Sequence, residues 1–319
     1  MVSLLAATCV LFSCSKEPVS QEQEKEKDTF SSISFNLTSR EFNISETPLS
    51  KAGDPKDWYA FQVYSRPSGT QDSYEYYAYG FFDNKADMII NLKDGYEYKF
   101  DVCMFVEASE KVYKFCLLNA GWTPVNNAFI LSSTESVRYM YGGYLYMNYP
   151  TRDTYDRPRV DRLMGRTEGY IPQEGGTVNI ELKRVAFGAK FVPTNFTTGS
   201  LEISIEGSGT ITMDAGVDTE KQEIISFAYP GRAYDTFMEG KEYSEDIPVN
   251  VVWIKEDGVR TPIANQSVSF KRNILTTVEF EVKENASSSS INLSGNENLQ
   301  DGSSVVIGGD GTNTGVDPQ

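Results

Sequence analysis

Apolar and polar residues alternate with a period of two along most of the chain from Phe30 onward. Such alternation is typical of strands with one buried face, whereas an amphipathic helix repeats every three to four residues. The clearest alternating segments are 33–37, 96–106, 201–205 and 278–282. Turn residues interrupt them often, and long helical patterns are nearly missing. We therefore predict an all-β fold built from β-sandwiches.

Breaks in the alternation divide the chain. Residues 150–169 are rich in Arg, Asp and Pro, and we interpret them as a long connection that ends a first domain. The chain after Glu284 is rich in Ser, Gly and Asn, a composition typical of flexible segments. The predicted organisation is a signal peptide at 1–13, a tether at 14–29, β-sandwich domains at 30–165 and 166–284, and a flexible polar tail at 285–319.

One hairpin can be read in register between residues 96 and 119. A turn centred on Ser109-Glu110 places apolar residues opposite one another on one face and Cys103 opposite Cys116 on the other. Directly opposed Cβ atoms lie about 4.5–5.5 Å apart, which is within adjustment of disulfide geometry. We hypothesise a Cys103–Cys116 disulfide in a protein exposed to an oxidising compartment; two buried free thiols are the alternative.

A second hairpin is centred on Gly142-Gly143, a pair suited to the positive φ angles of a two-residue turn. Its strands carry a ladder of tyrosines: Tyr139, Tyr141, Tyr144 and Tyr146. Such a ladder is either a platform on which sugars stack or ordinary cross-strand packing.

The N-terminal apolar run, Val2–Phe12, has the length of a signal-peptide core and is too short to span a membrane. No Lys or Arg precedes it, so either the true start lies upstream or the signal is atypical. Leu11-Phe12-Ser13-Cys14 resembles a bacterial lipobox, in which the cysteine thiol takes diacylglycerol and the new amino terminus is acylated. Cys14 is therefore the predicted lipidation site, with palmitate-type chains giving stable anchoring. An ordinary secretory signal is the alternative.

Composition narrows the chemistry. The formal net charge of -16 disfavours nucleic acid as a partner, because phosphate backbones would repel the chain. The sequence has no histidine, which excludes Ser-His-Asp and Cys-His catalysis and every imidazole metal site. A carboxylate-based enzyme is the remaining catalytic alternative. We expect no enzymatic activity, no cofactor and no metal site.

Two segments carry a family resemblance. Residues 180–191, IELKRVAFGAKF, look like the Leu-x-Arg-x-x-Ala-type strand that opens the second domain of fimbrillin-like surface lipoproteins of Bacteroides-type bacteria. Residues 269–282, SFKRNILTTVEFEV, resemble the closing strand of that domain. With the lipobox and the polar tether, the chain resembles this family. The resemblance implies two consecutive transthyretin-like β-sandwich domains, a lipid anchor in the outer membrane, and a place at the cell surface or in a fimbrium.

The resemblance also implies an adhesion role and a mode of assembly. An arginine- or lysine-specific protease removes the N-terminal strand of a subunit, and the groove accepts a strand from another subunit. Arg40 follows the alternating segment 33–37 and is the candidate cleavage site. The polar tail departs from the pattern of a donor strand, which favours an anchor or accessory subunit. The alternative is a monomeric outer-membrane lipoprotein that binds glycans or host proteins through aromatic-rich faces such as residues 74–82.

Overall fold

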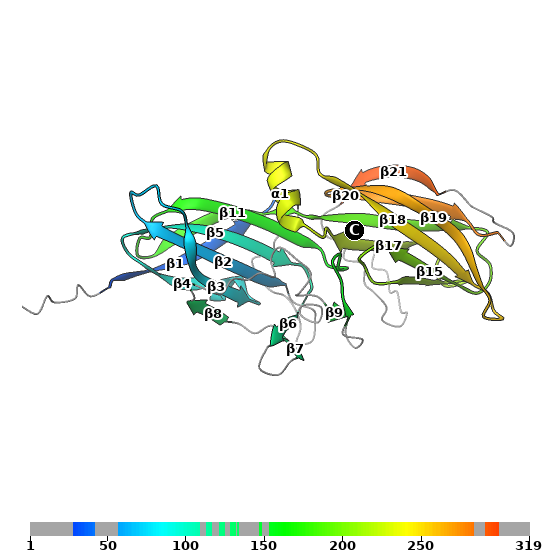
Figure 1. Cartoon of the computed structure of the whole chain (residues 1–319), viewed down its shortest axis with the longest axis horizontal. Helices are drawn as coiled ribbons and strands as arrows, with labels where there is room; N and C mark the ends of the chain where they lie inside the picture. The colour runs from blue at the N-terminus through cyan, green and yellow to red at the C-terminus, as the bar shows by residue number, and fades with distance from the viewer. Residues whose placement is uncertain are drawn as a thin grey trace, which may run out of the picture.

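The computed structural model describes residues 28–41, 57–108, 113–116, 121–124, 128–131, 133, 147–148, 153–283 and 291–299. Apart from one helix and one 3-10 turn, the regular elements among these residues are all strands, so the prediction of an all-β fold is confirmed. The strands form two sandwiches that lie end to end along the long axis of the molecule (Figure 1). We call them the first unit and the second unit.

The first unit packs a sheet of three strands against a sheet of six. The smaller sheet has the order β12 (Gly176–Glu181), β1 (Phe30–Thr38), β4 (Ile89–Lys93). The larger sheet has the order β13 (Lys183–Arg184), β11 (Arg162–Tyr170), β5 (Tyr96–Phe105), β2 (Trp58–Pro67), β3 (Glu75–Phe82), β8 (Ala128–Leu131). Strand β5 pairs with β2 and β11, so both of its edges are occupied.

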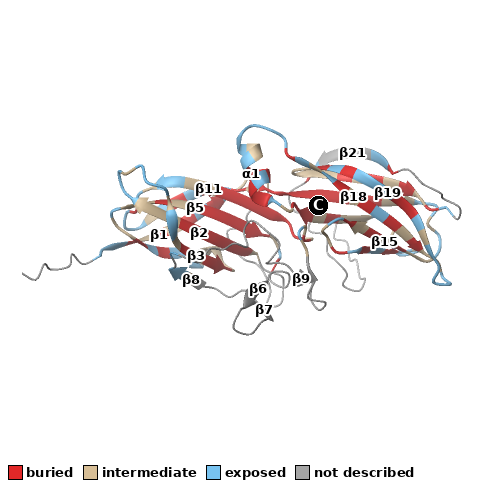
Figure 2. Cartoon of the chain, in the orientation of Figure 1, coloured by how far each residue is buried: buried red, intermediate tan, exposed pale blue. Residues whose placement is uncertain are grey.

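The core of the first unit lies between these two sheets, where buried positions dominate the inner strands (Figure 2). Phe35 of β1 is at its centre, with ring centroids 4.6 Å from Phe61 and 5.2 Å from Phe100. Alternate residues of β1, β4 and β12 point into this core, which is why their sequences alternate.

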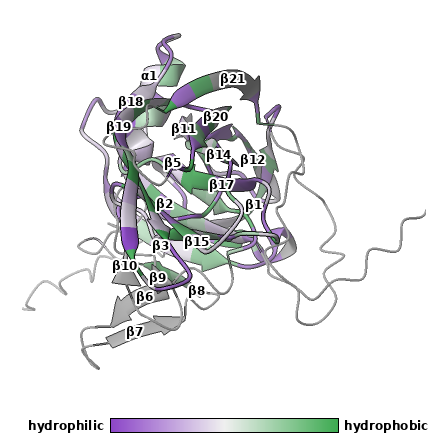
Figure 3. Ribbon diagram, turned by 90° about the vertical axis from the view of Figure 1, so that its right-hand side faces the viewer, coloured by the Kyte–Doolittle hydropathy of each residue, from purple (hydrophilic) through white to green (hydrophobic). Residues whose placement is uncertain are grey.

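The second unit packs two four-stranded sheets. One has the order β17 (Lys221–Ser226), β14 (Ala186–Thr194), β20 (Ile274–Glu281), β21 (Asn292–Asn298). The other has the order β16 (Ile211–Asp214), β15 (Ser200–Ile205), β18 (Ser244–Ile254), β19 (Arg260–Lys271). Seen end-on, the strands surround an interior with many hydrophobic positions (Figure 3). This core continues into the first unit through Trp58, Ala60 and Phe105, so the two units share apolar contacts.

A few short elements complete the fold. They are the 3-10 turn η1 (Lys85–Asp87), the two-stranded pairs β6 (Tyr113–Cys116) with β7 (Gly121–Pro124) and β9 (Met147–Asn148) with β10 (Asp153–Thr154), and the helix α1 (Pro230–Met238). Helix α1 lies at the junction of the units (Figure 1). It begins with Pro230 in its first turn and is followed by Gly240 at φ +78°. These two residues are the sequence signal for the helix, which the strand-centred prediction missed.

The strand pairing does not agree with the predicted domain boundary between residues 165 and 166. That boundary falls inside β11, and residues 162–170 form a long strand of the first unit rather than a connection. Strands β12 and β13 also pair within the first unit. The chain therefore passes to the second unit between Arg184 and Ala186. The segment 180–191 does contain the first strand of the second unit, β14, but it begins in the first unit.

The predicted hairpin between residues 96 and 119 is wrong, because its two strands do not pair with each other. Strand β5 lies between β2 and β11, and β6 pairs with β7, which places Cys116 opposite Gly121. Cys103 lies between Ala60 and Met164 in the larger sheet and is a free, buried thiol. The alternation misled the prediction because residues 100–105 are buried on both faces of the strand.

The described part of the tail is ordered as a strand. Residues 292–298 pair with β20, and Ile291 and Leu299 on either side are 5% exposed, which corrects the prediction of a polar tail without fixed structure for this segment. The segment 269–282 is also not one strand. It turns a corner at Arg272 and Asn273, where Asn273 has φ +56°, and passes from one sheet of the second unit to the other.

Candidate strand-exchange site

Strand β1 is the central strand of the smaller sheet. It runs parallel to β12 from Ile33 to Thr38 and antiparallel to β4 from Phe30 to Ser34. Its outward face joins β12 through side chains: Asn36 Nδ2 donates to Asn179 Oδ1 at 2.8 Å. Removing β1 would therefore leave two strands with open edges facing each other across a gap one strand wide.

Three apolar side chains fix β1 in the core. Ile33, Phe35 and Leu37 are 1%, 8% and 3% exposed. Burying a side chain of this size stabilises by about 1.5–3 kcal/mol. The strand is therefore held by its alternate side chains as well as by two ladders of backbone hydrogen bonds. The predicted strand-sized segment 33–37 is confirmed as a strand.

Arg40 lies two residues beyond the end of β1 and is open to solvent. Its side chain is 89% exposed, and within the described residues it makes a long ion pair, Nε to Glu181 Oε1 at 3.4 Å. Exposed pairs of this kind contribute about 0–1 kcal/mol. A protease that selects arginine can therefore reach this side chain at little cost.

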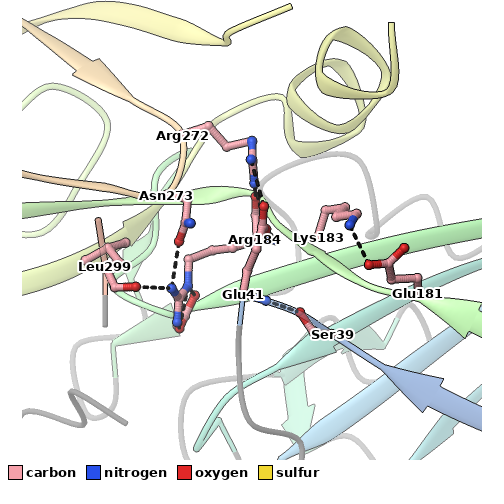
Figure 4. A network of polar contacts seen from close by, with 9 residues as sticks. Ser39, Glu41, Glu181, Lys183, Arg184, Arg272, Asn273 and Leu299 are labelled. Carbon is pink, nitrogen blue, oxygen red and sulfur yellow. Dashed lines mark hydrogen bonds and ion pairs between the residues drawn. The ribbon is translucent and has the colours of Figure 1, made fainter. Parts of the chain in front are cut away.

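Glu41, the next residue, is held tightly in contrast (Figure 4). Its carboxylate accepts hydrogen bonds from Arg272 Nη1 at 2.8 Å and Arg272 Nη2 at 2.9 Å, and a third from the backbone N–H of Arg184 at 2.8 Å. The backbone N–H of Glu41 donates to Ser39 Oγ at 3.1 Å. We call the Glu41–Arg272 pair the clamp. The sequence analysis did not predict the clamp. The one hint in the sequence was Arg272, a charged residue that interrupts the alternation of residues 269–282.

Beside the clamp lies a buried pair between Arg184 and Asp161. Arg184 Nε donates to both Asp161 oxygens at 3.0 and 3.1 Å, and the two side chains are 1% and 8% exposed. Arg184 Nη1 donates to Asn273 Oδ1 at 2.7 Å and to the carbonyl of Leu299 at 3.4 Å (Figure 4), and Nη2 lies 3.0 Å from Asp161 Oδ2. Burial raises the pKa of the Asp161 carboxyl, and the neighbouring Arg184 opposes that rise. Asn273 and Leu299 are neighbours at one end of the paired strands β20 and β21, so Arg184 ties the first unit to that end of the second-unit sheet.

Several predicted site residues lie outside the described residues. They are the lipidation site Cys14 and the tyrosine ladder of residues 139, 141, 144 and 146. Cys103 is described, and burial raises its pKa to about 12, which makes it a poor nucleophile. The disulfide predicted between Cys103 and Cys116 is not formed in this structure, because Cys103 is a free thiol.

The aromatic segment 74–82 is buried toward its C-terminal end, whereas its tyrosines are half-buried or exposed. Phe81 and Phe82 are each 5% exposed, whereas Tyr76 is 40% exposed and stacks on Tyr64 with ring centroids 5.3 Å apart. Among the described residues, no cluster of three or more acidic or cysteine side chains is placed to hold a metal ion. No helix in the described ranges is long and apolar enough to cross a membrane.

Comparison by sequence finds no matching protein-family model and no matching curated protein. Comparison by structure finds the tip fimbrial protein Mfa3 of Porphyromonas gingivalis, at 10% identity and a TM-score of 0.35, covering 85% of this chain and 100% of that one. The fimbrial anchor protein Mfa2 of the same organism matches at 9% identity and a TM-score of 0.34, covering 82% and 95%. A candidate cell adhesion protein of Bacteroides ovatus matches at 10% identity and a TM-score of 0.40, covering 86% and 98%. The solved structures to which this chain is similar thus include fimbrial and candidate adhesion proteins.

Proposed function

We propose that this chain is a non-enzymatic, lipid-anchored surface subunit that accepts a strand from another subunit after its own β1 has been released. In this proposal Cys14 carries the lipid in the outer membrane, the residues before Phe30 form the tether, and Arg40 is the cleavage site. The protein then acts as a fimbrial anchor or accessory subunit that supports adhesion.

The observation that carries the proposal is the position of β1 in the fold. It is the first described strand, it is central in its sheet, and an exposed arginine lies two residues beyond its end. Release of β1 would expose apolar core side chains, namely Ile90 and Val178 on the neighbouring strands and Phe61 on the facing sheet. It would also leave two strand edges unpaired. A strand with the same alternation from another subunit would restore both the burial and the ladders.

The described part of the tail favours a role in which this chain accepts a strand from another subunit rather than donating its own. Strand β21 is already paired with β20 of its own unit, and its flanking residues Ile291 and Leu299 are buried there. An intramolecular strand must leave these contacts before it can be donated. This supports the anchor or accessory role rather than that of a repeating stalk subunit.

The test uses the folded protein from residue 15 onward and limited digestion at Arg40. The cleaved protein is mixed with a fluorescent peptide of residues 29–40, and uptake is followed by size-exclusion chromatography. We expect uptake by cleaved protein alone, and no uptake of a matched peptide with Phe35→Asp, which would place a charge in the core. Equal uptake of both peptides, or none of either, would contradict the proposal. Lipidation is tested separately by loss of palmitate labelling in Cys14→Ala.

A second candidate is a monomeric surface protein that binds glycans. The specific observation in its favour is Tyr76, which presents an exposed ring stacked on Tyr64, with the Lys99 ammonium 5.3 Å from the Tyr64 ring centroid. Aromatic faces beside donors are suited to sugar rings. Glycan-array binding that is lost in Tyr76→Ala, with cleaved protein still monomeric, would favour this second function.

A further inference from the structure

The residue before the candidate cleavage bond and the residue after it are held very differently. The Arg40 side chain is 89% exposed, whereas the side chains of Glu41 and Arg272 are 15% and 9% exposed. A protease can therefore take the arginine side chain readily, while the residue on the other side of the bond belongs to the clamp.

Arg272 is itself fixed from three sides. Its guanidinium carbon lies 3.8 Å from the ring centroid of Phe237 on α1, and Nη1 donates to the carbonyl of Arg184 at 2.8 Å. Both terminal nitrogens donate to the Glu41 carboxylate, the bidentate geometry that gives the strongest ion pairs. Phe237 holds the guanidinium plane in place, so the clamp is preorganised before Glu41 reaches it.

The chain is also fixed on the other side of the bond. The carbonyl of Thr38 accepts from the backbone N–H of Leu182 at 2.7 Å, which ends the ladder between β1 and β12. The bond between residues 40 and 41 therefore lies in a short span anchored at Thr38 and at Glu41, with only two residues between the anchors. A protease binds the chain on both sides of the bond it cuts, and this span is too short to enter a protease cleft while both anchors hold.

We infer that the clamp protects the Arg40–Glu41 peptide bond and that cleavage requires Glu41 to leave Arg272 first. Glu41 and Arg272 are positioning residues for this cleavage; they do not take part in the hydrolysis. Water is added across the bond, leaving a carboxylate on Arg40 and an ammonium group on Glu41. This inference rests on the proposed function for its biological meaning, but it concerns only the rate of one cleavage.

The rate of cleavage then follows the population of protein in which the clamp is open. A net hydrogen bond to a charged group is worth about 1.5–3 kcal/mol, so removing the clamp should raise the rate at Arg40 by about tenfold to a hundredfold. Cleavage at an unrelated bond should not change.

The experiment is a timed digestion by trypsin of the full chain without its signal, with the fragment that begins at Glu41 counted by mass spectrometry. The variants are Arg272→Gln, which leaves the cleaved sequence untouched, and Glu41→Gln. The matched control is Lys271→Gln, which removes a neighbouring charge whose pair with Glu242 is 41% and 78% exposed. The bond after Arg260 serves as an internal reference in each digest. Peptides NLTSREFNISE and NLTSRQFNISE give the intrinsic preference of trypsin.

We expect both clamp variants to be cut at least tenfold faster at Arg40 than the wild type after correction by the peptides, with Lys271→Gln unchanged. Circular dichroism verifies the fold; if Arg272→Gln is unfolded, Arg272→Lys replaces it and should accelerate cleavage by a smaller factor. Rates within twofold of the wild type in the folded variants would overturn the inference. The proposed function fails by a different result, namely normal cleavage without uptake of the strand peptide.

Discussion

The buried pair between Arg184 and Asp161 offers a demanding test of the junction between the units. We consider Arg184→Met, which keeps an unbranched side chain of similar length but removes the guanidinium. The backbone N–H that Arg184 donates to Glu41 is retained, so the clamp keeps its third hydrogen bond. The change therefore isolates the contacts of the side chain.

The expected loss follows from burial. Arg184 is 1% exposed and Asp161 is 8% exposed, so the methionine would leave a carboxylate out of water without its partner. Removing one member of a buried ion pair costs about 3–5 kcal/mol. The double variant Arg184→Met with Asp161→Asn leaves no buried charge and should lose less than the sum of the two single variants, with a coupling of about 1–3 kcal/mol.

The acidity of Asp161 gives the prediction a second signature. Burial raises its pKa in the folded protein, so the native state holds a proton more readily than the unfolded state does. Its contribution to stability is therefore present at low pH and is lost as pH rises through the folded-state pKa. Arg184 opposes the rise in the pKa of Asp161, so removing its guanidinium should make the stability of the protein depend more strongly on pH. Arg184→Met should regain part of its stability when the pH is lowered from 7 to 5, whereas the double variant should not.

Urea unfolding followed by circular dichroism measures both effects. With a slope of about 3 kcal/mol per molar urea, a loss of about 4 kcal/mol lowers the midpoint by roughly 1.3 M. Arg260→Gln is the control, because its pair with Glu202 is 55% and 31% exposed and should contribute about 0–1 kcal/mol. The reasoning is refuted if Arg184→Met is no less stable than Arg260→Gln, or if the two single losses simply add.

Three further predictions concern single positions. Gly199→Ala should lower the melting temperature strongly, because the φ angle of Gly199 is +75° and an added Cβ would lie 2.2 Å from the carbonyl oxygen of Ile254. The control is Gly216→Ala, where φ is +78° but the space around the added Cβ is open, so the variant should lose only about 1 kcal/mol of stability through backbone strain. Equal losses in the two variants would contradict this prediction. Cys103 should resist a maleimide at pH 8 in the folded protein and react in urea, because burial raises its pKa to about 12; peptide mass spectrometry gives the readout. Leu299→Ala should speed hydrogen exchange in residues 292–298, since its 5% exposed side chain anchors β21, with exchange in β15 unchanged as the control.

The sequence predicts which segments form strands better than it predicts which strands pair with each other. Alternation at Ile33, Phe35 and Leu37 reports one buried face, and that information is local, so β1 could be found directly. Pairing is not local. The hairpin through Cys103 failed because β5 is buried on both faces and pairs with two strands distant in sequence, which a reading of adjacent segments cannot reveal.

The candidate site shows the same limit. Arg40 could be predicted because an arginine after a strand-sized segment is visible in the sequence itself. The clamp could not, since Glu41 and Arg272 are 231 residues apart and meet only after both units have formed. Charged residues are frequent in this chain, and no local pattern distinguishes a buried charge that has a partner from a solvated one.

The parallel pairing of β1 with β12 has a consequence for the order in which the protein folds. The ladder joins residues 143 apart, as between Asn36 and Asn179, so the smaller sheet cannot close until the chain has been made as far as the junction. Bringing such distant segments together is slow, because the entropy of closing the loop is lost before the contacts form. Among the strands that the structure describes, β1 is therefore the first to be synthesised and one of the last to be enclosed.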